Sequence, residues 1–342
     1  MAKFVLSTKT ALQQYNTLKP YADVIAYSSK TNPAITPTLE KHSDAMFSIH
    51  FKAELRHVQD KSRVLYFAQA WAEEDIASLI SQGVRWFTVD NEEDLKALLH
   101  YLESQDQKIN LLLRMRLKER TLKTERYYVF GMPAERVAEL VHELRDHPKI
   151  AKLGIHSHRK TQNMAEWSLA YEFQRTFDES VLAKIDLVNI GGGLPSHYAN
   201  TNKDVIQTVL AKIANMKEYV NANDCQLMLE PGRFISAPAC KLVTNILQVH
   251  GQTIVVDASV YQGDTDAFVV PAKLLVEGEL QKGEGKAFII KGVTPCSMDL
   301  FRYRVYLDSP KKGDTLTFLN AGAYNFTTDF CDLPVLETEL LG

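Results

Sequence analysis

A lysine that could act as a nucleophile lies in the stretch VIAYSSKTNP, residues 24–33. Four apolar or small residues lead into Ser28-Ser29-Lys30, so a strand is expected to present Lys30 at its carboxyl tip. A partly desolvated lysine gives up its proton more easily, and its neutral amine can then form a Schiff base. Most lysines are simply solvated, so Lys30 carries weight only together with other residues.

A histidine and a glutamate are candidates of the same kind. His158 ends the run LGIHSH and offers a flat aromatic face, a proton carrier or a metal ligand. No acidic residues cluster near it in the sequence, so we predict no metal site. Glu230 ends QLMLE, and a buried carboxylate there needs a partner or a proton. Arg233 is the simple partner; in the alternative, Glu230 faces a ring nitrogen and Arg233 binds phosphate.

Three consecutive glycines, Gly191, Gly192 and Gly193, follow the apolar run DLVNI. Glycines let backbone N–H groups approach an anion closely, and a following helix end adds favourable polarity. A tight turn without any ligand explains the triplet equally well. Which of these two interpretations holds depends on where the triplet lies in the fold.

Eight repeats of strand and helix are predicted to position these residues. Short apolar runs occur at 24–27, 46–49, 64–67, 86–89, 109–115, 153–158, 186–190 and 226–230. Amphipathic segments at 72–82, 92–102, 134–145, 166–177 and 203–220 lie between them, and the helix of the second repeat is short. This alternation implies parallel strands with right-handed crossovers, and eight units match an α/β fold of the (β/α)8 barrel type.

The pattern changes after Pro231. Runs typical of strands follow at 242–249, 253–258, 273–279, 286–291, 302–307 and 315–319, separated by short polar turns. They predict an antiparallel β-domain without helices until near its end. We therefore place the barrel in residues 1–235 and the β-domain in residues 236–342, and residues 1–20 fit either part.

Active sites of such barrels collect at the carboxyl ends of the strands. Those ends carry Lys30, Ser48, Arg114, His156, His158, the glycine triplet and Glu230, which are expected to meet on one rim. Phosphate sites recur after strands seven and eight of this fold, which favours phosphate binding for the triplet. A Schiff-base lysine, a phosphate cradle, a stacking histidine and an acid facing a ring nitrogen together suit pyridoxal phosphate.

The segments around these residues resemble the motifs of one family. YSSKTNP resembles its YAVKAN-type lysine motif, GIHSH its HFH-type motif, IGGGLP its glycine-rich loop and EPGRF its EPGR segment. TPCSMD resembles its cysteine motif and GAYNF its GAY motif. These motifs run in the family's order over nearly the whole chain. The sequence thus resembles the ornithine, arginine and diaminopimelate decarboxylases, pyridoxal-phosphate enzymes of fold type III with an alanine-racemase-like barrel.

The resemblance implies a role for each matching residue. Lys30, His158 and Cys296 would be catalytic: Lys30 by binding the cofactor covalently, His158 by stacking on its ring, and Cys296 by protonating the product. Cys296 would come from the partner subunit of a head-to-tail homodimer. The implied cofactor contacts are Lys30, His158, Thr161, Gly191, Gly192, Gly193, Glu230, Gly232, Arg233 and Tyr324, and Arg114 is added to them because it ends a strand.

The sequence departs from the family pattern at three places. Thr161 stands in for the serine after the histidine motif, and Lys160 occupies a glycine position. The second strand ends in Ser48-Ile49-His50, where the family has a small-acidic pattern. The acid that should directly follow Cys296 comes later, at Asp299, which weakens the transfer of the family's substrate-binding acid.

Glu230 favours decarboxylation over racemisation, because racemases of this fold have arginine there. A carboxylate keeps the pyridine ring protonated, and the ring then accepts the charge left at Cα. Asp264, Asp266 and Asp299 suit a distal ammonium or guanidinium group, although loop solvation explains each of them equally well. We predict decarboxylation of a basic amino acid of the ornithine, arginine or lysine type, giving CO2 and a di- or polyamine.

Several alternatives stay open. Diaminopimelate would need an arginine for its second carboxylate, a role that Arg302 can fill. A carboxynorspermidine-type decarboxylase usually has an acid where this chain has Arg233. A non-catalytic regulatory relative would tend to lose the cofactor residues that this chain keeps. A barrel enzyme acting on a phosphorylated sugar would leave Glu230 and the β-domain unexplained.

Composition argues against other classes of protein. The chain has 342 residues and a formal net charge of −3, which gives no electrostatic basis for binding nucleic acid. No apolar run approaches the roughly 20 residues of a membrane span, and the N-terminus lacks the apolar core of a signal peptide. The four cysteines lack short paired spacing, which disfavours zinc and disulfides and favours the cytoplasm.

Overall fold

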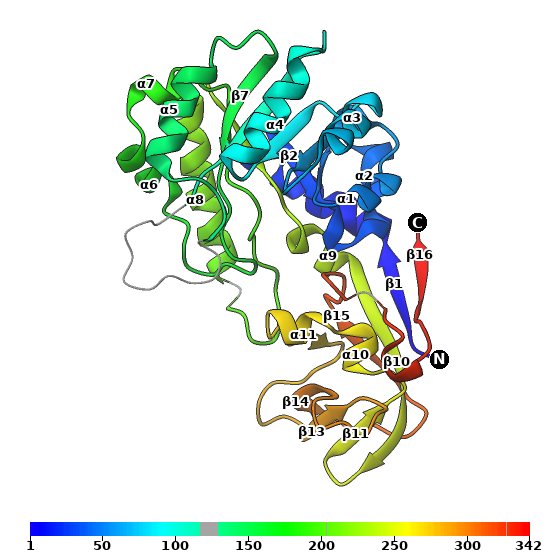
Figure 1. Cartoon of the computed structure of the whole chain (residues 1–342). Helices are drawn as coiled ribbons and strands as arrows, with labels where there is room; N and C mark the ends of the chain where they lie inside the picture. The colour runs from blue at the N-terminus through cyan, green and yellow to red at the C-terminus, as the bar shows by residue number, and fades with distance from the viewer. Residues whose placement is uncertain (117–128, 203, 326) are drawn as a thin grey trace. The chain divides into compact units, whose positions relative to one another are not determined.

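The structure is a computed structural model, and it describes residues 1–116, 129–202, 204–325 and 327–342. The chain forms two compact units, drawn in Figure 1. The barrel unit comprises Asn16–Leu194 and Asp204–Gly232, and the sheet unit comprises Met1–Tyr15, Pro195–Lys203 and Arg233–Gly342. Where the sequence suggested a boundary after residue 235, the units divide between Gly232 and Arg233.

Eight parallel strands close the barrel, which confirms the predicted architecture. The strands are β2 (Val24–Ser28), β3 (Met46–Ile49), β4 (Val64–Phe67), β5 (Trp86–Val89), β6 (Ile109–Arg114), β7 (Ile150–His156), β8 (Leu187–Asn189) and β9 (Gln226–Leu229). Each strand pairs with the next, and β9 pairs with β2. The carboxyl ends of all eight strands therefore lie on one rim.

Helices connect the strands of the barrel unit. They are α2 (Thr36–His42), α3 (Glu73–Ser81), α4 (Glu92–Glu103), α5 (Ala134–Leu144), α6 (Leu169–Thr176), α7 (Glu179–Leu182) and α8 (Asp204–Asn221). After β3 the chain makes only 3-10 turns, at Lys52–His57 and Lys61–Arg63, where the sequence predicted the weakest helix. The predicted last helix begins at Lys203, which lies outside the described residues.

Apolar side chains fill the barrel interior. Ala26, Leu65, Leu112, Leu187 and Met228 form one buried cluster contributed by five of the strands. Such layers make the barrel a packed core and not a pore.

The sheet unit is built on mostly antiparallel strands. They are β1 (Lys3–Ser7), β10 (Cys240–His250), β11 (Thr253–Val256), β12 (Leu275–Val276), β13 (Lys286–Lys291), β14 (Leu300–Leu307), β15 (Thr315–Leu319) and β16 (Glu337–Leu341). The main path runs β12-β15-β10-β11-β13-β14, and β1 joins it through β10 and pairs with β16. Two pairs, β11 with β13 and β1 with β16, are parallel. The opening run of the chain thus belongs to this unit.

Short helices interrupt the sheet unit where the sequence predicted none. They are α9 (Arg233–Ala239), α10 (Val260–Gly263) and α11 (Asp266–Val269), and α1 (Thr8–Leu18) follows β1. The two four-residue helices are too short to show a helical period of apolar residues. Strand β16, with the sequence ETELL, was missed because it is fully exposed and carries charges.

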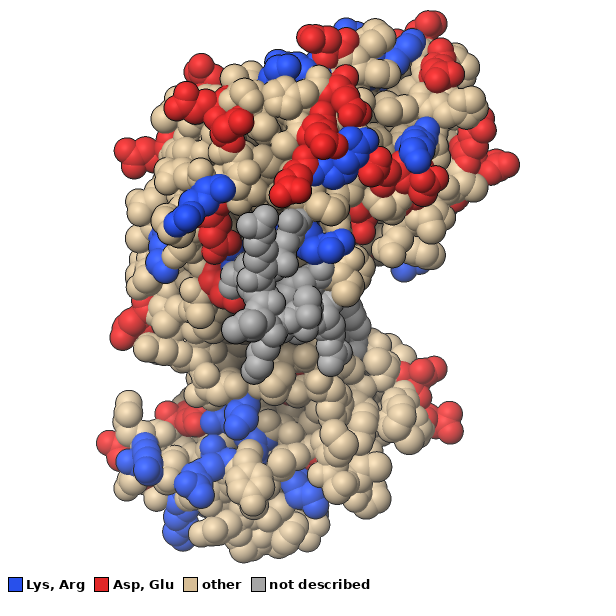
Figure 2. Space-filling view, turned by 60° about the vertical axis from the view of Figure 1, so that its left-hand side comes forward, with Lys and Arg blue, Asp and Glu red and all other residues tan. Residues whose placement is uncertain are grey.

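Acidic and basic side chains are intermixed over the outer face of the barrel unit shown in Figure 2. Arg136, for example, forms ion pairs with Glu92, Glu139 and Glu143. Such a mixed surface agrees with the small net charge of the chain. Among the described residues, no helix is both long enough and apolar enough to cross a membrane.

Candidate active site

Glu230 is the most strongly constrained acid of the barrel rim. It directly follows β9 and is buried, with an exposed fraction of 5%. Its Oε1 accepts a hydrogen bond from Asn189 Nδ2 at 2.6 Å, and its Oε2 accepts one from Ser48 Oγ at 2.9 Å. His156 Nε2 lies 3.3 Å from Oε1. Burial raises the pKa of Glu230, but the close contact with His156 and the nearby histidines outweigh it, and the pKa falls to about 2.

Lys30 lies on the same rim, in the 3-10 turn Ser29–Thr31 that follows β2. The residue as a whole is exposed, although its amine lies close to the buried acids of the rim. Burial lowers the pKa of the Lys30 amine, while Glu230 and Glu54 act in the opposite direction. A lowered pKa increases the fraction of neutral amine, which is the form that attacks a carbonyl carbon.

Gly232 brings the segment after β9 against the turn that carries Lys30. A Cβ atom at Gly232 would lie 2.2 Å from Thr31 Oγ1, so only glycine allows this approach. The backbone N–H of Ser28 also donates to the Pro231 carbonyl at 3.0 Å. The sequence suggested phosphate binding for Gly232, and the structure shows that it packs two strand ends together.

The glycine triplet holds His158. The Gly192 N–H donates to His158 Nδ1 at 3.2 Å, so this ring nitrogen carries no proton and the imidazole is neutral. Gly191 has φ +68°, and a Cβ there would lie 2.7 Å from His158 Nδ1. A Cβ at Gly192 would lie 2.6 Å from the Glu230 carbonyl oxygen. The triplet therefore sets the position of two predicted site residues at once.

Thr161 lies in the loop after β7, beside the triplet. The Asn163 N–H donates to the Gly193 carbonyl at 2.8 Å, and a Cβ at Gly193 would lie 2.7 Å from the Lys160 carbonyl oxygen. The loop that departs from the family pattern is thus packed on the glycine-rich loop. Within it Gln162 adopts φ +50°, a conformation that glycine would adopt more easily.

Arg114 ends β6 and forms an ion pair with Asp90 at 2.7 Å. Both residues line a cavity of about 90 Å³ at the barrel mouth, together with His50, Phe67, Ala68, Gln69 and Thr88. The His50 ring stacks on Phe67 with their centroids 4.7 Å apart, and burial lowers the pKa of His50 to about 3. Thr88 and Asp90 were not predicted as site residues, although Thr88 lies in β5 and Asp90 directly follows it, at a strand end where sites of this fold collect.

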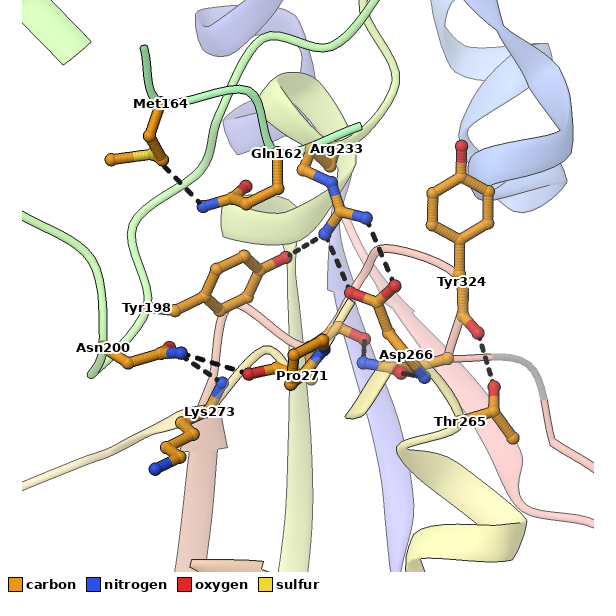
Figure 3. Close-up of polar contacts among 12 residues, drawn as sticks. Gln162, Met164, Tyr198, Asn200, Arg233, Thr265, Asp266, Pro271, Lys273 and Tyr324 are labelled. Carbon is orange, nitrogen blue, oxygen red and sulfur yellow. Dashed lines mark hydrogen bonds and ion pairs between the residues drawn. The ribbon is translucent and has the colours of Figure 1, made fainter. Parts of the chain in front are cut away.

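Arg233 belongs to the sheet unit and is ion-paired with Asp266, as Figure 3 shows. Nη1 lies 2.8 Å from Asp266 Oδ2, and Nη2 lies 3.2 Å from Oδ1. Nη1 also donates to the Tyr198 hydroxyl at 3.0 Å. The simple prediction that Arg233 balances Glu230 is therefore wrong, since the arginine pairs with an acid of its own unit.

The acids predicted to contact the substrate are buried. Asp264, Asp266 and Asp299 have exposed fractions of 0%, 1% and 0%. The Asp299 carboxylate accepts hydrogen bonds from the Val260 N–H at 2.8 Å and from both the N–H and the hydroxyl of Thr294. The fold encloses these three carboxylates. Their positions therefore do not support a contact with the substrate.

Arg302 is likewise engaged within the sheet unit. Its guanidinium forms an ion pair with Glu279 at 2.7 Å and also donates to the Leu274 carbonyl. The arginine that diaminopimelate would need is therefore already bound to another carboxylate. This placement does not support the role in carboxylate recognition that the sequence left open.

Cys296 is exposed, between β13 and β14 of the sheet unit. In the same unit lies an open apolar groove of about 510 Å³, lined by Tyr261, Thr265, Phe268, Met298, Thr328, Asp329 and Phe330. The Tyr261 ring stacks on Phe268 and Phe330, with centroid distances of 5.3 and 4.5 Å. Tyr324 adopts φ +56°, and its ring flanks Arg233 at 5.4 Å. The motif of Tyr324 includes Phe326, which lies outside the described residues.

Residues 5–237 match the family model described as pyridoxal-dependent decarboxylase, pyridoxal binding domain. The chain belongs to the pyridoxal-dependent decarboxylases. The resemblance found in the sequence motifs is thereby confirmed, and so is the cofactor, pyridoxal phosphate. The match also identifies the chain as an enzyme of amino-acid decarboxylation.

Known decarboxylases of several specificities are similar to this one. A 2-[(L-alanin-3-ylcarbamoyl)methyl]-2-hydroxybutanedioate decarboxylase of Staphylococcus aureus is 23% identical over 79% of this chain and 74% of its own length. The diaminopimelate decarboxylase of Archaeoglobus fulgidus is 23% identical over 78% of this chain and 68% of its own. The crystal structure of a lysine/ornithine decarboxylase from Vibrio vulnificus, complexed with cadaverine, shares the fold. It has a TM-score of 0.80 and 21% identity, and it covers 100% of this chain and 95% of the other.

Residues of the barrel rim fit pyridoxal phosphate by their chemistry. The cofactor needs an amine for its aldehyde, an acid for its ring nitrogen and a flat face for its ring. Lys30 has an amine of lowered pKa, Glu230 is an ionised buried carboxylate, and His158 has a neutral ring held by Gly192. These three groups come from three different strand ends of one unit.

Proposed function

We propose that this enzyme decarboxylates a basic amino acid of the ornithine, lysine or arginine type. The observation that carries the proposal is Glu230, an ionised carboxylate buried at the barrel mouth. Pyridoxal phosphate, when bound, accepts the electron pair that decarboxylation leaves at Cα. An acid that stays ionised favours the protonated form of the ring nitrogen. With this acid as the partner of the ring nitrogen, the cofactor is a stronger electron acceptor than it would be with an arginine in the same place.

The other rim residues have roles that follow from their positions. Lys30 would bind the cofactor covalently, and Ser48 and Asn189 orient the Glu230 carboxylate. His158 would stack on the ring, since the Gly192 N–H fixes its imidazole. The remaining proposed cofactor contacts are Arg114, Thr161, Gly191, Gly193, Gly232, Arg233 and Tyr324.

A basic substrate is supported by the state of Arg302 and by the relatives. Arg302 is buried and bound to Glu279, so a second substrate carboxylate gains no partner there. One solved relative is a lysine/ornithine decarboxylase with bound cadaverine. Diaminopimelate is the second candidate, because a similar curated enzyme has that activity.

Release of CO2 from competing substrates tests the proposal. Purified holoenzyme is assayed with ornithine, lysine, arginine, diaminopimelate and carboxynorspermidine in parallel. We expect the largest kcat/KM for one of the three basic amino acids. A preference for diaminopimelate or carboxynorspermidine would overturn the substrate class, and a protein that takes up pyridoxal phosphate but releases no CO2 would overturn the activity.

We also propose that two chains share each active site in a head-to-tail homodimer, with Cys296 acting in the site of the partner. Support comes from the exposure of Cys296, whose thiol is accessible on the surface of its own chain. Lys30, by contrast, belongs to the barrel unit. Mixing Lys30→Ala and Cys296→Ala subunits tests this proposal, because only a site shared between chains lets the mixture recover activity.

A further inference from the structure

His156 ends β7, and its ring lies against the most constrained acid of the barrel rim. Its exposed fraction is 1%, and its Nε2 lies 3.3 Å from Glu230 Oε1. Within the barrel it is in register with Arg114 of β6 and with Asn189 of β8, so these three side chains leave the sheet at one level. The proposed function leaves this histidine without a role.

The carboxylate of Glu230 is held by neutral donors. Asn189 Oδ1 accepts the Gly191 N–H at 2.8 Å, so Asn189 Nδ2 is the atom that donates to Glu230 Oε1. The Ser48 hydroxyl donates to Oε2. Each oxygen thus has one donor that carries no charge, and the His156 ring is a third group beside the carboxylate. Donors of this kind favour the ionised form of a buried acid.

His156 itself carries no charge at neutral pH. Burial lowers the pKa of His156, although the adjacent Glu230 acts in the opposite direction. Arg114 lowers this pKa further, and Asp90, the ion-pair partner of Arg114, opposes it. The imidazole is therefore neutral at pH 8, with a single proton on either Nε2 or Nδ1.

The surroundings of the two ring nitrogens decide where this proton lies. Nδ1 is buried and has no hydrogen-bond partner within the part of the chain that the structure describes. A proton on Nδ1 would leave a buried donor without an acceptor, and it would turn the lone pair of Nε2 toward the Glu230 carboxylate. A proton on Nε2 avoids both costs. At 3.3 Å its attraction to Oε1 is chiefly electrostatic, since the contact is long for a hydrogen bond.

We propose that His156 is a positioning residue that keeps Glu230 ionised by pointing an Nε2–H at its Oε1, so that the acid retains a proton on the ring nitrogen of the bound cofactor. The proposal rests on the proposed function, because that function makes Glu230 the partner of the ring nitrogen. His156 acts only through Glu230, and it neither gains nor loses a proton in this role.

The first test compares two substitutions of His156. His156→Leu removes the donor, whereas His156→Gln keeps an N–H at about the reach of Nε2. Each protein is loaded with pyridoxal phosphate labelled with 15N in its ring, and NMR follows the ring nitrogen from pH 6 to pH 10. We expect His156→Leu to lower the pH at which this nitrogen loses its proton by about one unit, and His156→Gln to restore most of the shift. An unchanged titration in folded His156→Leu overturns the proposal, as does an equal shift in both variants.

His50→Leu is the matched control. His50 is another histidine of the rim, its pKa is lowered to about 3 by burial, and its ring stacks on Phe67. Its replacement therefore removes a neutral imidazole of the same size from the same rim. The titration of the ring nitrogen is expected to match wild type. A shift as large as that of His156→Leu would assign the effect to the general polarity of the rim and overturn the proposal.

A second test applies even where His156→Leu does not fold. Cofactor-free wild type is labelled with 15N in its histidines, and couplings between ring nitrogens and ring protons identify the tautomer of His156 at pH 8. A proton on Nε2 is expected, and a proton on Nδ1 overturns the proposal. The two ideas also fail differently in wild type loaded with the cofactor. A ring nitrogen without a proton at pH 6 overturns the role of Glu230 in the proposed function, whereas a protonated one that is indifferent to His156 overturns the present proposal alone.

Discussion

At the scale of single residues, Glu230 and Arg233 lie three positions apart in the chain but have unrelated partners. Glu230 is bound by Ser48, Asn189 and His156 within the barrel unit. Arg233 is bound by Asp266 within the sheet unit. The nearness of this acid and this base in the EPGR segment suggests that they pair with each other. Instead, each of them binds partners of its own unit.

Replacing Glu230 by glutamine removes the charge and keeps the size of the side chain. Turnover is expected to fall on the order of a hundredfold or more, because the ring nitrogen loses the group that keeps it protonated. Cofactor is expected to remain bound, as judged by the absorbance of the purified protein. Glu103→Gln, at an exposed position of α4, is the control. Turnover equal to wild type in Glu230→Gln would refute the role of this carboxylate.

The buried carboxyl group of Asp264 is expected to make the free energy of unfolding depend on pH. Burial raises the pKa of Asp264 above that of an unfolded aspartate, and the neighbouring Asp266 adds to the shift. The folded state then binds the proton more tightly than the unfolded state, so stability falls as pH rises from the unfolded pKa to the folded pKa. The slope reaches about 1.4 kcal/mol per pH unit.

Asp264→Asn should remove this contribution. Chemical denaturation between pH 4 and pH 9 is expected to show a gain over wild type that increases with pH through that window. Equal pH profiles of the two proteins would mean that folding leaves the pKa of Asp264 unchanged, which would contradict its burial as a neutral acid. Asp308→Asn, at an exposed position of the sheet unit, controls for general effects of charge.

At the scale of elements, the glycine triplet after β8 acts as a spacer between a histidine and a strand end. His158 packs against Gly191, and the Glu230 backbone packs against Gly192. The apolar runs of the sequence located the strands, and the rule that sites lie at strand ends located the triplet. The contact of Gly192 with Glu230 joins segments 38 residues apart, so no local pattern predicts it.

Gly192→Ala is expected to move both His158 and Glu230. The added methyl group would lie 2.6 Å from the Glu230 carbonyl oxygen, and overpacking of this kind costs about 1–3 kcal/mol. Cofactor affinity should fall together with the melting temperature. Gly278→Ala is the control: its φ is +76° and the space around it is open, so it should lower stability without changing cofactor affinity. Wild-type affinity in Gly192→Ala would show that the triplet does not position the site.

At the scale of the whole molecule, the chain combines two compact units, each with its own buried polar centre. The centre of the barrel unit contains Glu230 and Lys30, and that of the sheet unit contains Arg233, Asp264 and Asp266. Cys296 is exposed on the sheet unit. A shared active site would require a second chain, which makes the assembly the property to test.

Mixing two inactive variants tests the shared site. Lys30→Ala and Cys296→Ala are each expected to be nearly inactive. After mixing and exchange of subunits, activity should recover to about a quarter of wild type, because half of the dimers are mixed and each mixed dimer has one intact site. Absence of recovery, in a sample whose subunits demonstrably exchange, would exclude a site shared between chains.

The sequence alone determined the barrel, its order of strands and the residues of its rim. Apolar runs and strand-end positions are local properties, so they can be recognised along the chain. The order of the motifs indicated the family. Only the tertiary structure decided the partners of the buried charges. The sequence offered Asp264, Asp266 and Asp299 either as substrate contacts or as solvated loop acids, yet all three are buried in the fold. Burial and countercharge depend on which segments pack together, and the spacing of residues along the chain does not carry that information.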